Sequence, residues 1–233
     1  MKTITTEMID KFRKNYESDS KALTLTGAMA RSEIADLAYI PMNAAKLNGE
    51  FSVEVKTRGI TAQRKSGRCW MFAALNILRE IIAEKINVES FELSQNFESF
   101  YDKLEKSNNF LQSVIDSAHL EMTERQIEYY MWGVSDGGYW DMAKDLIKKY
   151  GVVPKSAMPE TYQSEHTEKF NKLMNSLLKK DAAELRRLVR EGKDAEARKE
   201  EMLSEIFKAQ CIAFGEPVDK FDFDYKDKDG TYH

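Results

Sequence analysis

The sequence predicts an α+β fold in which helices dominate. Most apolar residues recur at helical spacing, only two short stretches alternate as a strand does, and Gly or Pro residues follow several helical patterns. The helical patterns cover roughly residues 7–17, 69–85, 94–107, 109–131, 139–150 and 164–214. The alternating stretches are 51–57 and 221–233, so we expect a β-rich part of the fold to be largely absent from this sequence.

The central segments carry clear helix boundaries. The apolar residues of 69–85 surround most of the helix, which predicts a helix buried inside a domain. Ser94 is a good N-cap for the helix that follows it. The pattern over 139–150 ends at Gly151 with Pro154 beyond, which is the usual arrangement at a helix C-terminus.

The segment 164–214 is polar, rich in Lys, Arg and Glu, and interrupted at 191–194. We expect a helical hairpin whose charged residues form a solvated face. Its apolar stripe could equally contact another subunit. The stripe consists of Leu177, Leu185, Leu188, Val189, Met202 and Ile206.

Composition and charge exclude several classes of protein. The 233 residues are 42% hydrophobic and 32% charged, as in a soluble globular protein, and the formal charge of -4 argues against a general nucleic-acid binder. No signal peptide or membrane span is visible, so a cytoplasmic location is expected. Cys69 and Cys211 are then expected to stay reduced. The histidines do not cluster, so neither a metal nor another cofactor is predicted.

Cys69 is the residue that suggests catalysis. It stands where a Ser-Gly-Arg loop becomes the helix 69–85, and the first turn of a helix favours an anion such as a thiolate. Arg68 beside it adds positive charge. The backbone N–H of Cys69 and the side-chain amide of Gln63 could donate to an oxyanion. A buried structural cysteine is the alternative, and it is the interpretation preferred for Cys211, on an apolar helical segment.

The stretch QRKSGRCWMFAALNILRE, which contains Cys69, resembles the active-site segment of the bleomycin hydrolase and aminopeptidase C family of papain-like cysteine peptidases. Further stretches resemble the same family in order: FELSQNFESFYDKLEKSN, DGGYWDM, KKYGVVPKS and GEPVDKFDFDYKDKDG. The resemblance implies a papain-like fold, mainly its helical half with a helical insertion. It also implies a cytosolic homohexamer that acts on peptides with a free N-terminus, without a cofactor.

By position, the resemblance implies that Cys69 is the nucleophile and Gln63 the oxyanion-hole donor. Trp70 matches the residue packed behind the nucleophile. Gly137 and Gly138 match a glycine pair whose backbone binds the substrate chain in an extended manner, a task that the absence of a Cβ permits. On its own, the Asp-Gly-Gly sequence would predict only a turn.

A cysteine peptidase also needs a general base, normally a histidine held by Asn or Asp. None of His119, His166 and His233 is assigned to this role, so the catalytic His and Asn are expected outside this chain. We expect four regions: an N-terminal arm or hook (1–50), the helical catalytic half (51–160), a helical insertion (161–214) and the start of a β-rich half (215–233).

Two alternatives to an aminopeptidase remain open at this point. The chain could be a non-catalytic, truncated helical interaction module, or it could be part of a papain-like endopeptidase. In either catalytic case, the chain alone is expected to be inactive.

Overall fold

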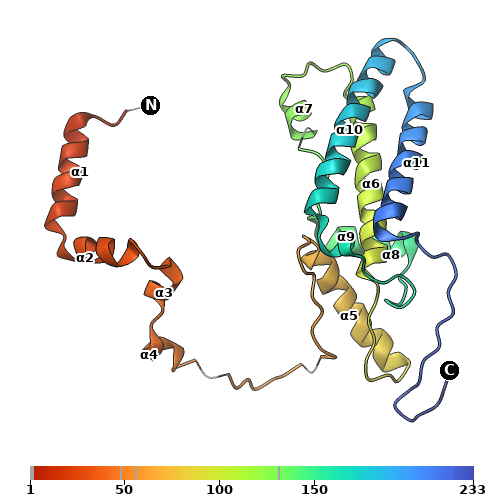
Figure 1. Cartoon of the computed structure of the whole chain (residues 1–233), viewed down its shortest axis with the longest axis horizontal. Coiled ribbons are helices and arrows are strands. Elements are labelled where there is room, and N and C mark those ends of the chain that lie inside the picture. The colour runs from red at the N-terminus through yellow and green to blue at the C-terminus, as the bar shows by residue number, and fades with distance from the viewer. Residues whose placement is uncertain (1–2, 48, 56, 131) are drawn as a thin grey trace. The chain divides into compact units, whose positions relative to one another are not determined.

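The computed structural model describes residues 3–47, 49–55, 57–130 and 132–233, and most of them are helical (Figure 1). The chain divides into two compact units, Met1–Val55 and Lys56–His233. Each unit is described by itself. The four regions expected from the sequence remain a prediction.

The first unit contains four short helices: α1 (Thr6–Ser18), α2 (Ser20–Met29), α3 (Ile34–Ala38) and α4 (Pro41–Ala44). The helix predicted over 7–17 is confirmed as α1. Thr5 caps α1 and Asp19 caps α2, because their side chains accept hydrogen bonds from free backbone N–H groups of the first turn.

The strand predicted over 51–57 is wrong for the residues that the structure describes there. Residues 51–55 are irregular, and Lys56 lies outside the described residues. Phe51, Val53 and Val55 are about four-fifths exposed, at 79%, 79% and 80%. Their alternation meets no partner strand, and an alternating pattern forms a strand only where neighbouring backbone completes its hydrogen bonds.

In the second unit, α5 (Cys69–Lys85), α6 (Gln95–Asp116) and α8 (Trp140–Tyr150) pack against one another. The predicted boundaries are confirmed at Cys69, at the N-cap Ser94 and at the C-cap Gly151. The buried residues at this junction are Met71, Leu75, Leu93 and Leu146. The sequence predicted that most sides of this helix are buried. One face of α5 is exposed instead, since Ile77 and Ile81 are more than half exposed, at 51% and 58%.

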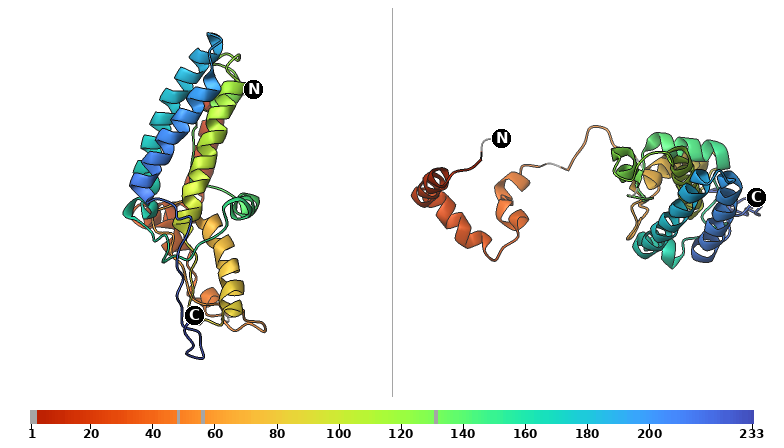
Figure 2. Two further views of the ribbon diagram at one scale, coloured as in Figure 1. Left: turned by 90° about the vertical axis from the view of Figure 1, so that its right-hand side faces the viewer. Right: turned by 90° about the horizontal axis from the view of Figure 1, so that it is seen from above.

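The predicted hairpin is confirmed as α10 (Thr167–Arg190) and α11 (Ala195–Phe214), which lie beside α6 (Figures 1 and 2). The apolar stripe predicted from the sequence packs against α6 within this chain. The core of the three-helix layer includes Phe110, Leu111, Leu178, Leu185, Met202 and Ile206.

Two other stretches differ from prediction. The helices expected over 94–107 and 109–131 are one helix, α6, followed by a loop and the short α7 (Arg125–Tyr130); Met131 lies outside the described residues. The polar residues near 107 do not break α6, because the Ser107 hydroxyl donates to the Lys103 carbonyl inside the helix. The end of the chain, 221–233, forms only an isolated bridge between Lys226 and Tyr232.

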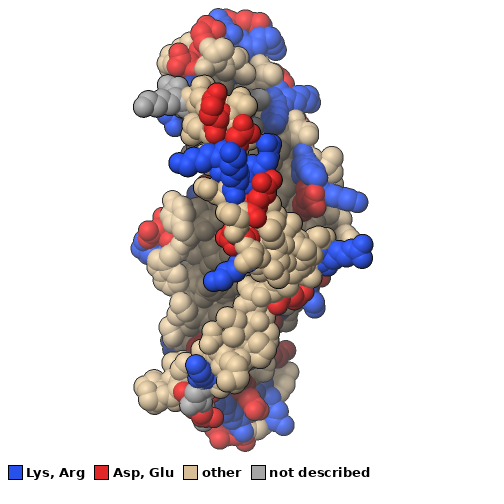
Figure 3. Space-filling view, turned by 90° about the vertical axis from the view of Figure 1, so that its left-hand side faces the viewer, with Lys and Arg blue, Asp and Glu red and all other residues tan. Residues whose placement is uncertain are grey.

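Charges of both signs are interspersed on the face shown in Figure 3. Within the described residues, no helix has the length and apolar character needed to span a membrane.

Glu98, in the first turn of α6, is a buried carboxyl with neither oxygen hydrogen-bonded among the described residues. Burial, together with the negative charge of Asp102 one turn later, raises the pKa of Glu98 to about 8. An unfolded chain holds this carboxyl at its ordinary pKa of about 4.3. The folded state therefore binds the proton more tightly, and its stability falls as the pH rises from about 4.3 to 8.

We predict that Glu98→Gln makes the chain more stable than wild type at pH 8.5, by on the order of a few kcal/mol, and changes stability much less at pH 4.5. The neutral amide removes the cost of ionising a buried carboxyl. Urea unfolding at both pH values measures the difference. The exposed Glu168→Gln serves as the control, and an equal effect of Glu98→Gln at both pH values would contradict the prediction.

Candidate active site

The loop before α5, residues 57–68, is held to the rest of the second unit by several polar contacts. The Arg58 guanidinium pairs with the Glu80 carboxylate of α5 at 2.5 Å. Thr61 and Asn76 hydrogen-bond through their side chains at 2.9 Å. The Lys65 N–H donates to the carbonyl of Glu165 at 3.0 Å, at the end of the short α9 (Tyr162–Glu165). The chain therefore approaches Cys69 along a defined path.

A second network begins at the backbone of Gln63. The Ser66 hydroxyl donates to the Gln63 carbonyl at 2.7 Å and accepts from Nε of Arg68 at 2.8 Å. The Arg68 guanidinium then binds both carboxylate oxygens of Glu160, at 3.1 and 3.0 Å. These contacts fix the main chain at Gln63. The side-chain amide of Gln63 is half-buried and hydrogen-bonds to no protein group among the described residues.

Cys69 is the first residue of α5, and its side chain is exposed. In the described part of the chain, the N–H groups of Cys69 and Trp70 donate to no protein group. Two free N–H groups at a helix N-terminus favour negative charge beside them. The sequence suggested that Arg68 adds positive charge beside Cys69. In the structure the Arg68 guanidinium is instead buried, at 1% exposed, and pairs with the Glu160 carboxylate.

Asp136 links the Cys69 loop to the rest of the unit. Its carboxylate accepts from the Gly67 N–H at 3.1 Å, and its carbonyl accepts from Nε1 of Trp70 at 2.8 Å. The same carboxylate binds three side chains from two helices. These are the Lys103 ammonium, the Thr167 hydroxyl at 2.5 Å and the Asn171 amide at 3.0 Å.

The charge on Asp136 is stabilised within a buried setting. Burial opposes its ionisation, but the Lys103 charge and the hydrogen bonds from Lys103, Thr167 and Asn171 outweigh burial and hold the pKa of Asp136 well below its ordinary range. The carboxylate therefore stays ionised at neutral and mildly acidic pH.

The predicted glycine pair lies next to Trp70. A Cβ built on Gly138 would come within 2.4–2.8 Å of three indole carbons of Trp70. A Cβ on Gly137 would meet only the Ser135 hydroxyl, at 3.7 Å. Gly138 is therefore required for close packing against Trp70, whereas Gly137 has open space beside it.

Helix α10 also supports the loop that leads to the glycine pair. The Asn175 side chain accepts from the N–H of Val134 at 2.7 Å and donates to its carbonyl at 2.9 Å. Gly133 before it has φ +79°, and a Cβ there would overlap Asn175 at 2.3 Å. The insertion thus carries part of the site's scaffold.

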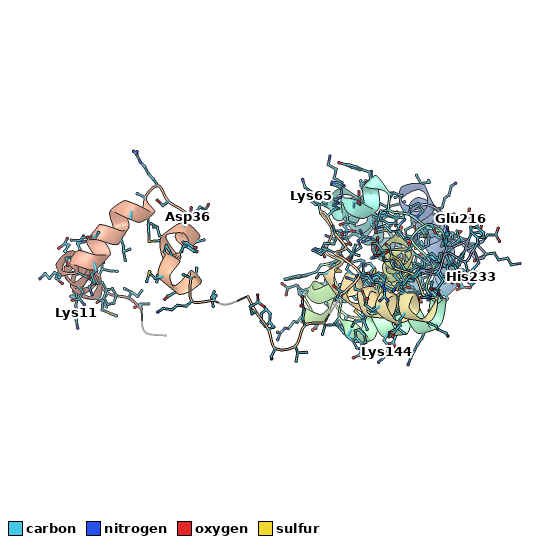
Figure 4. All side chains as sticks on the ribbon, turned by 90° about the horizontal axis from the view of Figure 1, so that it is seen from below. Lys11, Asp36, Lys65, Lys144, Glu216 and His233 are labelled. Atoms are coloured by element: carbon cyan, nitrogen blue, oxygen red, sulfur yellow. The ribbon has the colours of Figure 1, made fainter. Side chains whose placement is uncertain are left out.

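No histidine of the chain hydrogen-bonds to Cys69 in the described residues. His119 is exposed just after α6. His166 adjoins the loop through its backbone, but its ring stacks on Tyr162 at 4.2 Å. His233 pairs with Asp227 and lies well apart from Lys65 of the Cys69 loop (Figure 4).

The second cysteine has a different setting. Cys211 is half-buried on α11, and burial, with the charge of Glu216, raises the pKa of its thiol. Among the described residues, no group of three or more His, Cys, Asp or Glu side chains is placed to hold a metal ion.

The sequence indicated Cys69, Gln63, Trp70, Gly137 and Gly138 as candidate site residues, which stay predictions, but not the residues that contact their loops. The missed residues are Lys103, Lys106, Asp136, Thr167, Asn171 and Asn175. The one available signal was an Asp directly before the glycine pair, which suggested only a turn.

Known proteins are similar to this chain over almost its whole length. The model of the Peptidase C1-like family matches residues 3–233. Aminopeptidase C of Listeria innocua is 40% identical over 98% of this chain and 52% of its own length. Aminopeptidase E of Lactobacillus helveticus is 39% identical over 99% of this chain and 53% of its own length. The chain thus spans about half the length of these curated relatives.

A crystal structure of PepW from Lactobacillus rhamnosis HN001 superimposes with a TM-score of 0.93 at 40% identity, over 99% of this chain and 53% of that one. The predicted fold class is confirmed, since the described residues form mainly the helical half of a papain-like fold, with a helical insertion. The chain therefore belongs to the Peptidase C1-like family.

Proposed function

We propose that the chain supplies the nucleophile and the oxyanion site of a cysteine aminopeptidase that releases N-terminal residues from peptides. The observation that carries this proposal is the exposed Cys69 at the start of α5, beside unpaired N–H groups. The aminopeptidase names of relatives about 40% identical favour this activity over an endopeptidase.

In the proposed mechanism, the Cys69 thiolate attacks the first peptide carbonyl of the substrate and a tetrahedral oxyanion forms. The Cys69 N–H and the Gln63 side-chain amide donate to this oxyanion. An imidazolium protonates the leaving amine, and an acyl-enzyme remains. Water, activated by the same imidazole, then attacks the acyl-enzyme and frees the amino acid and the thiol.

We further propose that the general base lies outside the three histidines of this chain. The partners of His166 and His233 and the exposed position of His119 support this view. Without that base the chain alone should be inactive. A cytoplasmic location and assembly into a homohexamer belong to the same proposal.

The substrate chain is proposed to run alongside Gly137 and Gly138. In the described residues, the N–H of Gly138 donates to no protein group, so it is available to a second backbone. Gly138 packs on Trp70, the residue after Cys69, which places this donor close to the nucleophile loop.

In the complete enzyme, we predict that Cys69→Ala abolishes peptide hydrolysis and that Gln63→Ala lowers kcat by about 10²- to 10³-fold, as for other oxyanion-hole donors. Steady-state kinetics on a dipeptide with a free N-terminus measures both effects. Unimpaired hydrolysis by Cys69→Ala would refute the assignment.

In this chain, we predict that iodoacetamide labels Cys69 at least about tenfold faster than Cys211 at pH 6, because only Cys69 lies at a helix N-terminus. Peptide mass spectrometry separates the two sites. Equal labelling rates for the two cysteines would mean that Cys69 is not activated.

The glycine pair offers a matched test of packing. We predict that Gly138→Ala destabilises the chain by about 1–3 kcal/mol, because its methyl group would overlap the Trp70 ring. Gly137→Ala should stay within about 1 kcal/mol of wild type, since it has negative φ and open space. Urea unfolding compares the two variants, and equal destabilisation would show that Trp70 does not constrain Gly138.

A further inference from the structure

The ammonium group of Lys106, on α6, makes three hydrogen bonds. Its Nζ donates to the Asp102 carboxylate at 2.7 Å, to the Ser135 carbonyl at 3.0 Å and to the Gly137 carbonyl at 2.7 Å. A lysine ammonium has three protons to donate, so all three are engaged. The same ammonium lies 5.4 Å from the ring centroid of Trp70.

The hydrogen bond from Lys106 to the Gly137 carbonyl determines the orientation of the peptide group between Gly137 and Gly138. The described chain has no cis peptide bonds, so the peptide group between Gly137 and Gly138 is trans. In a trans peptide, the C=O and the following N–H point in opposite directions. Because the Gly137 carbonyl is directed at Lys106, the Gly138 N–H is directed away from it. Glycines have little conformational preference of their own, so this orientation depends on an external partner.

Trp70 packs against Gly138 but makes no hydrogen bond to the main chain of the glycine pair. Within the described residues, Lys106 is the only side chain that hydrogen-bonds to the main chain of Gly137 or Gly138. Lys103, one turn earlier, binds the carboxylate of Asp136 and makes no contact with the pair. Nothing in the Lys106 contacts involves Cys69 or Gln63. The loss of Lys106 should therefore affect the glycine pair and leave the nucleophile unchanged.

We propose that Lys106 is a positioning residue that holds the Gly137 carbonyl and thereby directs the Gly138 N–H toward the backbone of a bound peptide. The Asp102 carboxylate, one turn earlier on α6, also holds the Lys106 ammonium, at 2.7 Å. This inference rests on the proposed function, because it assigns a role to Lys106 in presenting the peptide-binding backbone.

The test uses Lys106→Met, which keeps the length of the side chain and removes its donors, and Lys106→Arg, which restores charge and donors. Lys172→Met is the matched control, since Lys172 is an exposed lysine of α10 that pairs one turn away with Glu168. Two probes are applied to each variant. One is amide hydrogen exchange over residues 134–139. The other is Cys69 labelling, by iodoacetamide or by a dipeptide chloromethyl ketone with a free N-terminus, whose peptide group can pair with Gly138.

For Lys106→Met we expect exchange over 134–139 to accelerate. The dipeptide reagent should need up to about tenfold more concentration for half-maximal labelling, the loss expected when one neutral hydrogen bond, between the reagent and the Gly138 N–H, is lost. The iodoacetamide rate should stay within about twofold, Lys106→Arg should restore most of the loss, and Lys172→Met should behave as wild type. Unchanged exchange, or an equal fall in both labelling rates, would overturn the proposal.

The outcomes separate this inference from the proposed function. If wild-type Cys69 shows no activation, the peptidase proposal fails, whereas the exchange data still decide whether Lys106 holds the loop. If Lys106→Met does not fold, Lys106→Gln takes its place, because its shorter neutral amide cannot reach both carbonyls. Normal exchange in Lys106→Gln would then overturn the proposal.

Discussion

The candidate site depends on the buried ion pair between Lys103 and Asp136. Taking two charges out of water is costly, and their attraction offsets that cost only when the remaining donors and acceptors are also satisfied. Asp136 meets this condition, because its carboxylate also accepts from the Gly67 N–H, the Thr167 hydroxyl and the Asn171 amide. Loss of one partner would leave a charge buried without compensation, at a cost of about 3–5 kcal/mol.

This ion pair explains how two distant loops come to act together. The Asp136 carboxylate binds the loop two residues before Cys69, its carbonyl binds Trp70, and the glycine pair follows it directly in the chain. Thr167 and Asn171 come from α10. Helix α10 is therefore part of the scaffold that holds the candidate site together.

Local patterns predicted the helices well, because each boundary has a local chemical cause. Ser94 caps α6 through its own side chain, and Gly151 ends α8 with φ +77°. The ion pair could not be predicted in this way, since Lys103 and Asp136 are 33 residues apart and such side chains are usually solvated. The alternation over 51–57 misled for a related reason, because strand formation depends on a partner that the stretch itself does not encode.

Several charged side chains of α6 bind polar groups of the loop that lies beside this helix. Ser135 and Gly137 belong to an irregular, exposed loop, and among the described residues no strand or helix backbone donates to their carbonyls. Lysine is suited to this task, because one ammonium can serve two carbonyls and a carboxylate at once. Without Lys106, these exposed carbonyls would bond only to water, and the orientation of the peptide group after Gly137 would not be fixed. Lys106 and Asp102 of α6 thus serve to hold a glycine-containing segment in place next to Trp70.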